Sequence, residues 1–285
     1  MKERIKGSEL TQRFYDQKGW TVEDGQTVDH KLFGVRENGP IRIELHSLFL
    51  ARLRAVLSRA GTELNLLECG CGGQPEKNIL DLCSRYTGVD FSLTGLQTAR
   101  STLSDSSTPT RLLNADVCAL PFADDSFDAV YCAHMIYHID SVEAQDAALT
   151  ELMRVVRHGG ILVLVTANPR PLLFPFRLAK RLAADTPVLG RLINRVRPKP
   201  SLPYQPMTIG WTRKKLAESG KVRIVAGSIP STHFAQHSTE YAGIGKQAWR
   251  AIRWLTVNKP VLSAYLGNYV MMTCHKPPQH LPETV

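Results

Sequence analysis

Short apolar runs alternate with segments of helical spacing through the middle of this 285-residue chain. The runs have the length of buried strands, and the segments between them repeat their apolar residues with a helical period. The predicted strands are residues 65–68, 86–90, 111–114, 129–132 and 161–166, and the predicted helices are residues 76–84, 93–103 and 142–156. This alternation is typical of a parallel sheet with helices on both faces. We therefore expect a doubly wound α/β fold, whose ligands bind at the carboxyl ends of the strands.

The parts of the chain outside this alternation predict additions to the core. Residues 1–60 contain a predicted helix at residues 41–59, and we expect them to form an N-terminal helical lid. The aromatic positions ahead of that helix are Phe14, Tyr15 and Trp20. The predicted core comprises residues 61–167 and 211–285, the latter with a helix at 211–219 and strands at 222–226 and 269–274. After the helix at 142–156, basic residues followed by Gly159 and Gly160 predict a basic last turn with a glycine stop.

Residues 168–210 combine eight prolines with an excess of positive charge. Between Arg170 and Pro200, eight Lys and Arg residues and one Asp give a net charge of +7, out of +9 for the whole chain. Proline at this density breaks long helices, so we predict an inserted cap of short helices and turns. Because large apolar residues lie between the cations, this cap suits a peripheral membrane contact through residues 170–200, or an apolar pocket with an anion-binding rim. A solvated cap that packs on the core is an equally good interpretation.

The composition, 43% hydrophobic and 21% charged, is that of an ordinary globular protein and excludes a disordered or fibrous chain. Apolar runs such as residues 161–165 are far shorter than the roughly 18 residues that a membrane-spanning helix needs. The start of the chain is charged but lacks the apolar block of a secretory signal, so a cytoplasmic location is expected. Several of the six cysteines lie in apolar stretches, as reduced thiols do, and their spacing does not predict a metal site.

A glycine-rich turn follows the first predicted strand, with the sequence Leu66-Leu67-Glu68-Cys69-Gly70-Cys71-Gly72-Gly73. Glycines at this position let a ligand approach the backbone closely. The second strand ends in Asp90, 18 residues after Gly72, where a carboxylate can accept hydrogen bonds from both hydroxyls of a ribose. The third strand leads to Asp116. Pro75 stands where a dinucleotide-binding turn has its last glycine, which argues against a dinucleotide.

The order of these motifs resembles that of the class I S-adenosylmethionine-dependent methyltransferases, especially the group that includes ubiquinone and menaquinone methylases. The resemblance covers about residues 60–166. It implies a Rossmann-like fold with a mostly parallel seven-stranded sheet, and S-adenosylmethionine as the cofactor. Gln74 departs from the family, which usually has glycine there, and this leaves the geometry of the turn open.

The resemblance also implies where the cofactor binds. The expected contacts are Glu68, Gly70, Gly72 and Gly73 at the amino-acid end, Asp90 at the ribose, Phe91, Asp116 and Val117 at the adenine, and Ala133 and His134 at the methionine portion. Asp90 and Asp116 could instead be turn residues, but their positions at successive strand ends favour binding.

Two histidines in the stretch after the fourth strand are candidates for catalysis. His138 could take a proton from a hydroxyl or an acidic carbon during methyl transfer, and His134 could contact the cofactor or the substrate. Methyl transfer can also proceed by alignment and desolvation without a base, and the sequence leaves this choice open.

We expect O- or C-methylation of a small-molecule or isoprenoid-like, lipid-like acceptor. Methylation of RNA is the main alternative, suggested by the positive charge. Against nucleic acid, the chain has no separate basic domain, and Cys132-Ala133-His134-Met135 stands where a base-methylating motif would be. A third possibility is a protein that binds the cofactor without methylating.

Overall fold

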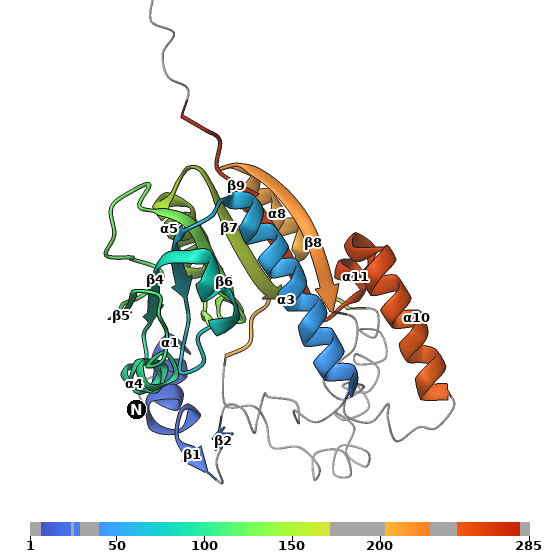
Figure 1. Ribbon diagram of the computed structural model, residues 1–285, viewed down its shortest axis with the longest axis horizontal. Coiled ribbons are helices and arrows are strands. Elements are labelled where there is room, and N and C mark those ends of the chain that lie inside the picture. The colour runs from blue at the N-terminus through green and yellow to red at the C-terminus, as the bar shows by residue number, and fades with distance from the viewer. Residues whose placement is uncertain (1–6, 24–25, 29–39, 172–202, 229–243, 280–285) are drawn as a thin grey trace, which may run out of the picture.

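The computed structural model describes residues 7–23, 26–28, 40–171, 203–228 and 244–279. These residues build a seven-stranded sheet with helices on both faces (Figure 1). The strand order is β5-β4-β3-β6-β7-β9-β8, and neighbouring strands are parallel except where β9 pairs with β7 and β8. The strands are β3 (Leu64–Cys69), β4 (Cys83–Asp90), β5 (Thr110–Asn114), β6 (Phe127–Ala133), β7 (Val156–Ala167), β8 (Lys221–Ser228) and β9 (Tyr269–His275). The predicted Rossmann-like fold is confirmed.

Helices and a small hairpin surround this sheet. They are α1 (Gly7–Phe14), the π-helical turn η1 (Tyr15–Gly19), the hairpin β1 (Val22–Glu23) and β2 (Gln26–Thr27), α3 (Pro40–Ala60), the 3₁₀ helix η2 (Lys77–Leu82), α4 (Leu93–Thr102), η3 (Ile136–His138), α5 (Val142–Val155), α8 (Ile209–Ala217), α10 (Ile244–Asn258) and α11 (Pro260–Leu266). In Figure 1, α3 crosses the near face of the sheet, whereas α5 and α8 lie behind it.

Each face of the sheet carries its own hydrophobic core. Consecutive residues of β3 point to opposite faces, so Leu66 packs with Leu53 and Leu57 of α3, while Leu67 packs with Leu149 of α5. Because both faces are covered, β3 is buried almost throughout and lacks the polar alternation of a strand with one wet face. The sheet is therefore fixed from both sides, which holds the carboxyl ends of its strands in place.

The helix predicted at residues 76–84 is wrong. The chain forms the short 3₁₀ helix η2 over Lys77–Leu82 and enters β4 at Cys83, which pairs with Leu64 of β3. The parallel pairing with β3 outweighs the helical spacing of the apolar residues, which is only a weak local preference.

The glycine stop predicted after α5 is also wrong. The helix ends at Val155 and β7 begins at Val156, so Gly159 and Gly160 lie inside a strand. Gly160 packs against the carbonyl of Asp128, 2.7 Å from where a Cβ would stand. A register shift in β6 lies at the same place, so these glycines permit close strand contact rather than a helix end.

The C-terminal part contains more helix than the sequence predicts. The structure confirms a helix near 211–219, as α8, and strands near 222–226 and 269–274, as β8 and β9. It adds α10 and α11 between these two strands, which were not predicted.

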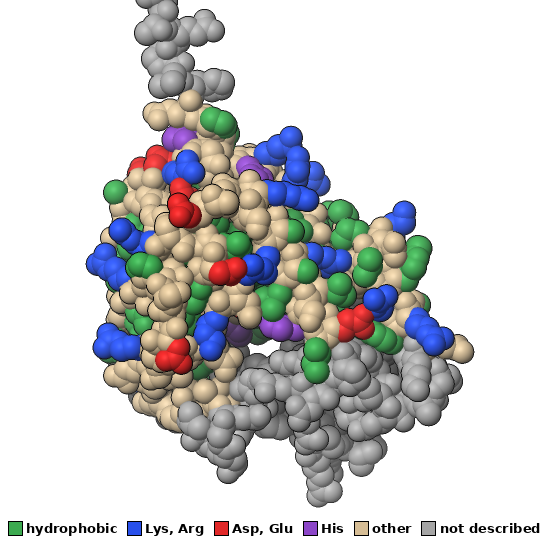
Figure 2. Space-filling model, in the orientation of Figure 1, with side chains coloured by type: hydrophobic (Ala, Val, Ile, Leu, Met, Phe, Trp, Pro, Cys, Tyr) green, Lys and Arg blue, Asp and Glu red, His purple; other side chains and the backbone are tan. Residues whose placement is uncertain are grey.

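Most of the predicted basic cap lies outside the described residues. Only residues 168–171 and 203–210 of this segment are described, so the predicted membrane contact at 170–200 stays a prediction. On the face shown in Figure 2, Lys and Arg side chains lie over several elements, with Asp and Glu side chains between them. In the described part of the chain, no helix is long and apolar enough to cross a membrane.

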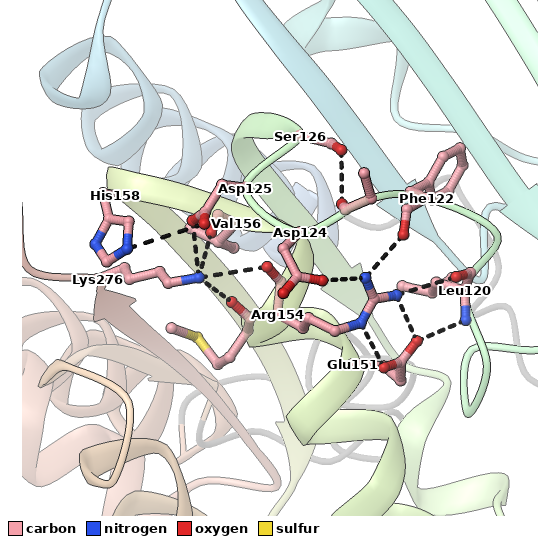
Figure 3. A network of polar contacts seen from close by, with 12 residues as sticks. Leu120, Phe122, Asp124, Asp125, Ser126, Glu151, Arg154, Val156, His158 and Lys276 are labelled. Atoms are coloured by element: carbon pink, nitrogen blue, oxygen red, sulfur yellow. Dashed lines mark hydrogen bonds and ion pairs between the residues drawn. The ribbon is translucent and has the colours of Figure 1, made fainter. Parts of the chain in front are cut away.

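A polar network ties the end of α5 to the loop before β6 (Figure 3). Arg154 donates to the carbonyls of Leu120 and Phe122, at 3.0 and 2.8 Å. It also pairs with Glu151 and Asp124, at 2.7 and 2.8 Å. The hydrogen bonds that Arg154 donates to Glu151 and Asp124 raise the pKa of its guanidinium, which therefore stays charged. The network lies where the parallel strands begin, at the opposite edge of the sheet from their carboxyl ends.

Arg154→Met should therefore lower the free energy of unfolding by about 1–3 kcal/mol, because two part-buried carbonyls each lose the hydrogen bond that the guanidinium donates. The pair with the exposed Asp124 contributes little to this loss. Chemical denaturation measures the change. Ligand affinity should stay at the parent value, and an unchanged unfolding curve would show that the network is only a surface contact.

Candidate functional site

A cavity of about 1200 Å³ lies at the carboxyl ends of the parallel strands. Residues from the ends of β3 to β7, from α1 and η1, and from α3, α10 and β9 line it. The predicted site residues that line it are Glu68, Gly70, Asp90, Phe91, Asp116, Val117, Ala133, His134 and His138. Gly72 and Gly73 do not line it. The fold thus brings most of the predicted residues together, at the place where open α/β sheets bind ligands.

Glu68 is a buried carboxyl at the end of β3. Its Oε2 accepts hydrogen bonds from the Tyr86 hydroxyl at 2.7 Å and from the backbone N–H of Glu76 at 3.1 Å. Burial nevertheless raises its pKa to about 7, because the two bonds offset only part of the loss of water. Both of these bonds use Oε2, so the other carboxyl oxygen, Oε1, can accept a hydrogen bond from a ligand in the cavity that Glu68 lines.

Asp90 connects the end of β4 to both neighbouring turns. One carboxylate oxygen accepts from the N–H of Gly72 and the other from the N–H of Ser92, each at 2.8 Å. Only 6% of the residue is exposed, and this burial raises its pKa to about 6. Each oxygen keeps a second lone pair, so the carboxylate can hold the glycine turn and still accept hydroxyl donors from a ligand.

The raised pKa of Asp90 predicts that ligand affinity depends on pH. Ribose hydroxyls donate best to the ionised carboxylate, and about a tenth of it is ionised one unit below a pKa of about 6. The affinity for S-adenosylhomocysteine should therefore increase about tenfold from about pH 5 to about pH 8. Calorimetric titrations across this range measure it. In Asp90→Asn, the change of affinity near pH 6 should be lost, whereas any change near pH 7 that Glu68 causes should remain. The same change near pH 6 in the variant would contradict the assignment of this pH dependence to Asp90.

The predicted adenine contacts lie at the ends of β4 and β5. Asn114 donates from its side-chain amide to the carbonyls of Asp90 and Phe91, at 3.1 and 2.9 Å, and so joins the two strand ends. Asp116 accepts from the N–H of Cys118 through Oδ1 at 2.9 Å, as turn residues do, and it also lines the cavity. The turn and binding interpretations of Asp116 are thus compatible.

The glycine turn has two different surfaces. Gly70, with φ +76°, lines the cavity, and its N–H donates to the Val89 carbonyl at 2.8 Å. Gly72, with φ +50°, and Gly73 lie against the indole of Trp20, whose ring a Cβ at Gly72 would overlap. Trp20 in turn stacks on Tyr15, with ring centroids 5.3 Å apart. Gly72 and Gly73 therefore make room for Trp20, and Gly72 also positions the turn through its hydrogen bond to Asp90.

The N-terminal residues are fastened to the same edge of the sheet. Gln12 donates to the Phe91 carbonyl at 3.0 Å, and Asp16 accepts from the Ser92 hydroxyl at 2.7 Å. Thr94 donates to the Asp16 carbonyl at 3.0 Å. These contacts hold the aromatic pair Tyr15 and Trp20 at the cavity, where the sequence predicted a lid.

His134 follows β6 in a conformation that is uncommon for a residue with a side chain. Its φ is +58°, and its N–H donates to the Val165 carbonyl at 3.0 Å. The residue lines the cavity and keeps part of its surface accessible, but burial by the surrounding protein, and to a smaller extent the charge of His138, lowers the pKa of the ring to about 4. The ring is therefore neutral near pH 7, and it packs edge-on against Tyr269 at 4.7 Å.

His138 has a defined tautomer. Its Nδ1 lies 2.8 Å from the Pro203 carbonyl, which can only accept, so Nδ1 carries the hydrogen and Nε2 keeps its lone pair. Burial lowers the pKa of the ring, so the neutral form prevails near pH 7. This is the state that a general base requires.

Three tyrosines surround these histidines and were not predicted. Tyr137 lies 5.4 Å from Tyr204 and 6.3 Å from Tyr269, measured between ring centroids, and 4.6 Å from His138. A signal existed for Tyr269, because it begins the strand predicted at residues 269–274. This strand, β9, pairs antiparallel with β7, so its first residue lies at the carboxyl edge of the parallel strands. Tyr204 carried no such signal, because it follows the irregular, proline-rich segment.

The site shows no sign of metal binding in the described residues, where no three His, Cys, Asp or Glu side chains come together as metal ligands would. All six cysteines are free, and Cys69, Cys71, Cys132 and Cys274 are buried. Burial raises the pKa of the Cys71 thiol, so it stays protonated and unreactive.

Comparisons with known proteins agree with this geometry. Residues 67–164 match the family model described as a methyltransferase domain. A sterol 24-C-methyltransferase of Gibberella zeae is 26% identical over 163 residues, which are 53% of this chain and 40% of that protein. A demethylmenaquinone methyltransferase of Staphylococcus aureus is 29% identical over 161 residues, which are 55% of this chain and 65% of that protein. The chain thus spans about half the length of these curated relatives.

Solved structures show the same fold. Magnesium protoporphyrin IX methyltransferase from Synechocystis PCC 6803, with bound S-adenosylmethionine, superposes with a TM-score of 0.54 at 10% identity. The match covers 97% of this chain and 100% of that one. The family match indicates S-adenosylmethionine as the cofactor. Residues 67–164 therefore match a methyltransferase domain, and they lie in a sheet with the Rossmann-like fold seen in class I S-adenosylmethionine-dependent methyltransferases.

Proposed function

We propose that this protein transfers a methyl group from S-adenosylmethionine to a small-molecule acceptor with a large apolar body, on oxygen or carbon. One observation carries the proposal: a single cavity joins the carboxyl groups at the strand ends to an aromatic cluster around His138. The first part suits a ribose and a cationic amino acid, and the second suits an apolar acceptor. The relatives named for sterol and menaquinone methylation support an acceptor of this kind.

The residues present fit the cofactor. Asp90 would accept from the ribose hydroxyls, Glu68 and the Gly70 backbone would surround the amino-acid end, and Phe91 with Val117 would pack on the adenine. Carboxylates close to a positively charged sulfonium and ammonium are favourable in a partly desolvated cavity. Bound there, the cofactor supplies an electrophilic methyl group. Tyr15 and Trp20, as parts of a lid, would exclude water from it.

His138 would take the proton from the acceptor through its free Nε2. Its Nδ1–H bond to Pro203 holds the ring orientation, and Tyr137 and Tyr204 pack beside it. His134, neutral and edge-on to Tyr269, would contact the reacting groups without holding a charge. The free cysteines support the cytoplasm as the place of this reaction.

His138→Asn tests whether His138 acts as a general base or only positions the acceptor. The asparagine amide can still donate to Pro203 but removes Nε2, so kcat should decrease by about 10²- to 10⁴-fold with unchanged affinity for S-adenosylhomocysteine. In the parent, kcat should increase with pH through a pKa below the usual 6.5. A decrease in kcat of less than about tenfold, with the same pH profile, would mean that alignment alone drives the transfer.

The proposal as a whole is tested by methyl transfer. The full chain is incubated with methyl-labelled S-adenosylmethionine and panels of apolar phenols, hydroxyquinones and isoprenoid alcohols. The labelled methyl group should be transferred to acceptors of one of these classes, and the Asp90→Ala variant should transfer much less of it. Binding of S-adenosylhomocysteine without any transfer to these panels or to total RNA would instead favour a protein that binds the cofactor without methylating.

A further inference from the structure

Arg52 is a cation in the cavity, on the helix α3, which contains none of the predicted site residues. We propose that the acceptor carries an anionic group, a carboxylate or a phosphate, which Arg52 and the Thr256 hydroxyl bind. The proposal rests on the proposed function, since it names the class of acceptor that the same cavity takes.

Arg52 lies on the face of α3 that lines the cavity. Leu45, Leu48, Phe49 and Arg52 all line it, at the i, i+3, i+4 and i+7 spacing of one helix face. Three of these four residues are apolar, and His46 of the same helix also lines the cavity, so α3 presents a mostly apolar surface that ends in one guanidinium. A ligand lying along this face would meet an apolar wall and then a cation.

The guanidinium has one polar partner in the described part of the chain. Its Nη2 donates to the Thr256 carbonyl, and no other hydrogen bond or ion pair of Arg52 is found among the described residues. Arg54 differs, because it forms two hydrogen bonds with the Asp81 carboxylate at 2.6 and 2.7 Å. Arg52 is half-buried, and burial lowers its pKa, which remains far above neutrality for a guanidinium. A partly desolvated cation with unused donors is a good receptor for an anion.

Thr256 supplies a second, independent observation. It lines the cavity and is only 1% exposed, and its hydroxyl has no hydrogen-bond partner among the residues that the structure describes. A buried hydroxyl without a partner is unfavourable, and in helices threonine usually bonds the carbonyl four residues earlier. Here the free hydroxyl lies on the same residue whose carbonyl holds Arg52, so the two groups can bind one anion together.

The charges around the cavity decide where an anion can lie. Arg52 is the one Lys or Arg among the described residues that line it, whereas six acidic residues do so: Glu9, Glu68, Glu76, Asp90, Asp116 and Asp140. An anionic acceptor would be repelled from the acidic strand ends and attracted to Arg52. Apolar side chains of β8 and β9, including Ala226 and Met271, also line the cavity and would contact its body.

Matched probes test this inference on the full chain saturated with S-adenosylhomocysteine. The probes are 3-hydroxy-2-naphthoate, 2-naphthyl phosphate and neutral 2-naphthol, and calorimetry gives their affinities. At least one anion should bind about tenfold or more tightly than 2-naphthol, as expected for a charge-assisted hydrogen bond. The tighter of the two anions identifies the group as carboxylate or phosphate.

Variants assign the preference to Arg52. Arg52→Met should reduce the affinity for the two anionic probes to that for 2-naphthol. Arg52→Lys should keep part of the preference for the anionic probes. Arg59→Met, which removes an exposed charge from the same helix, should change nothing. Thermal unfolding of each variant confirms that it is folded. Equal binding of the anions and 2-naphthol by the parent, absent binding of all three, or a preference that survives Arg52→Met would overturn the proposal.

The cofactor's own carboxylate is the competing anion. If Arg52 held it, Arg52→Met would weaken S-adenosylhomocysteine binding and leave the probe preference intact, which also overturns the proposal. We expect unchanged affinity for S-adenosylhomocysteine. If the parent failed to bind S-adenosylhomocysteine but still preferred the anionic probes through Arg52, the proposed function would fail and the anion site would stand.

Discussion

Asp90→Ala is expected to bind S-adenosylhomocysteine about 10- to 150-fold more weakly than the parent, because hydrogen bonds to a charged group contribute about 1.5–3 kcal/mol. Two effects act together. The ribose loses its acceptor, and the N–H groups of Gly72 and Ser92 lose the carboxylate that joins their turns. Calorimetry near neutral pH measures the affinity, and equal binding by a folded variant would remove Asp90 from the site.

Asp128→Ala is the matched control. Asp128 also accepts from a backbone N–H, that of Asn65 at 2.7 Å, and it pairs with Arg157. It lies near the beginning of β6, at the far edge of the sheet from the cavity. The control should lose stability and keep its affinity for S-adenosylhomocysteine. If both variants lost affinity equally, the effect of Asp90→Ala would be one of folding.

Gly72→Ala is expected to lower the free energy of unfolding by about 1–3 kcal/mol, the usual cost of overpacking, with a further cost for alanine at positive φ. From the sequence alone, a methyl group at this position would be expected to meet the cofactor. In the structure it meets the Trp20 ring instead, and would displace it. Because Trp20 and Tyr15 line the cavity, affinity for S-adenosylhomocysteine should fall as well.

A double-mutant cycle assigns this effect to Trp20. Trp20→Leu shortens the side chain, so Gly72→Ala should be less destabilising in that background, by about 0.5–3 kcal/mol. Gly210→Ala is the control, since a Cβ there meets nothing within 4 Å and the residue lies in α8. It should be neutral or slightly stabilising. Additive effects of Gly72→Ala and Trp20→Leu would show that the ring does not limit this position.

The sheet could be predicted because its signals are local. Buried parallel strands are short apolar runs, and those of β3, β4, β6 and β7 stand out against their flanks. The helix predicted at residues 76–84 was wrong because the apolar spacing there is helical, whereas Cys83 pairs with β3 and belongs to the sheet. Local pattern cannot reveal that competition, since the partner strand lies 19 residues earlier.

The cofactor side of the site could be predicted because strand ends meet at one edge of a parallel sheet. Glu68, Asp90 and Asp116 needed only the strand positions to be placed together. Arg52 and Thr256 could not be found this way, because α3 and α10 reach the cavity through packing between segments about 200 residues apart. Likewise, nothing local in the sequence pairs Trp20 with Gly72 and Gly95.

The central claim is that the cavity at the carboxyl ends of β3 to β6 holds S-adenosylmethionine. The most direct test is an experimental structure of the full chain with S-adenosylhomocysteine. We expect the ligand in this cavity, with its adenine between Phe91 and Val117. Its ribose hydroxyls should lie within hydrogen-bond distance of the Asp90 carboxylate, up to about 3.0 Å for an O–H donor. A ligand bound anywhere else, or a ribose without contact to Asp90, would contradict it.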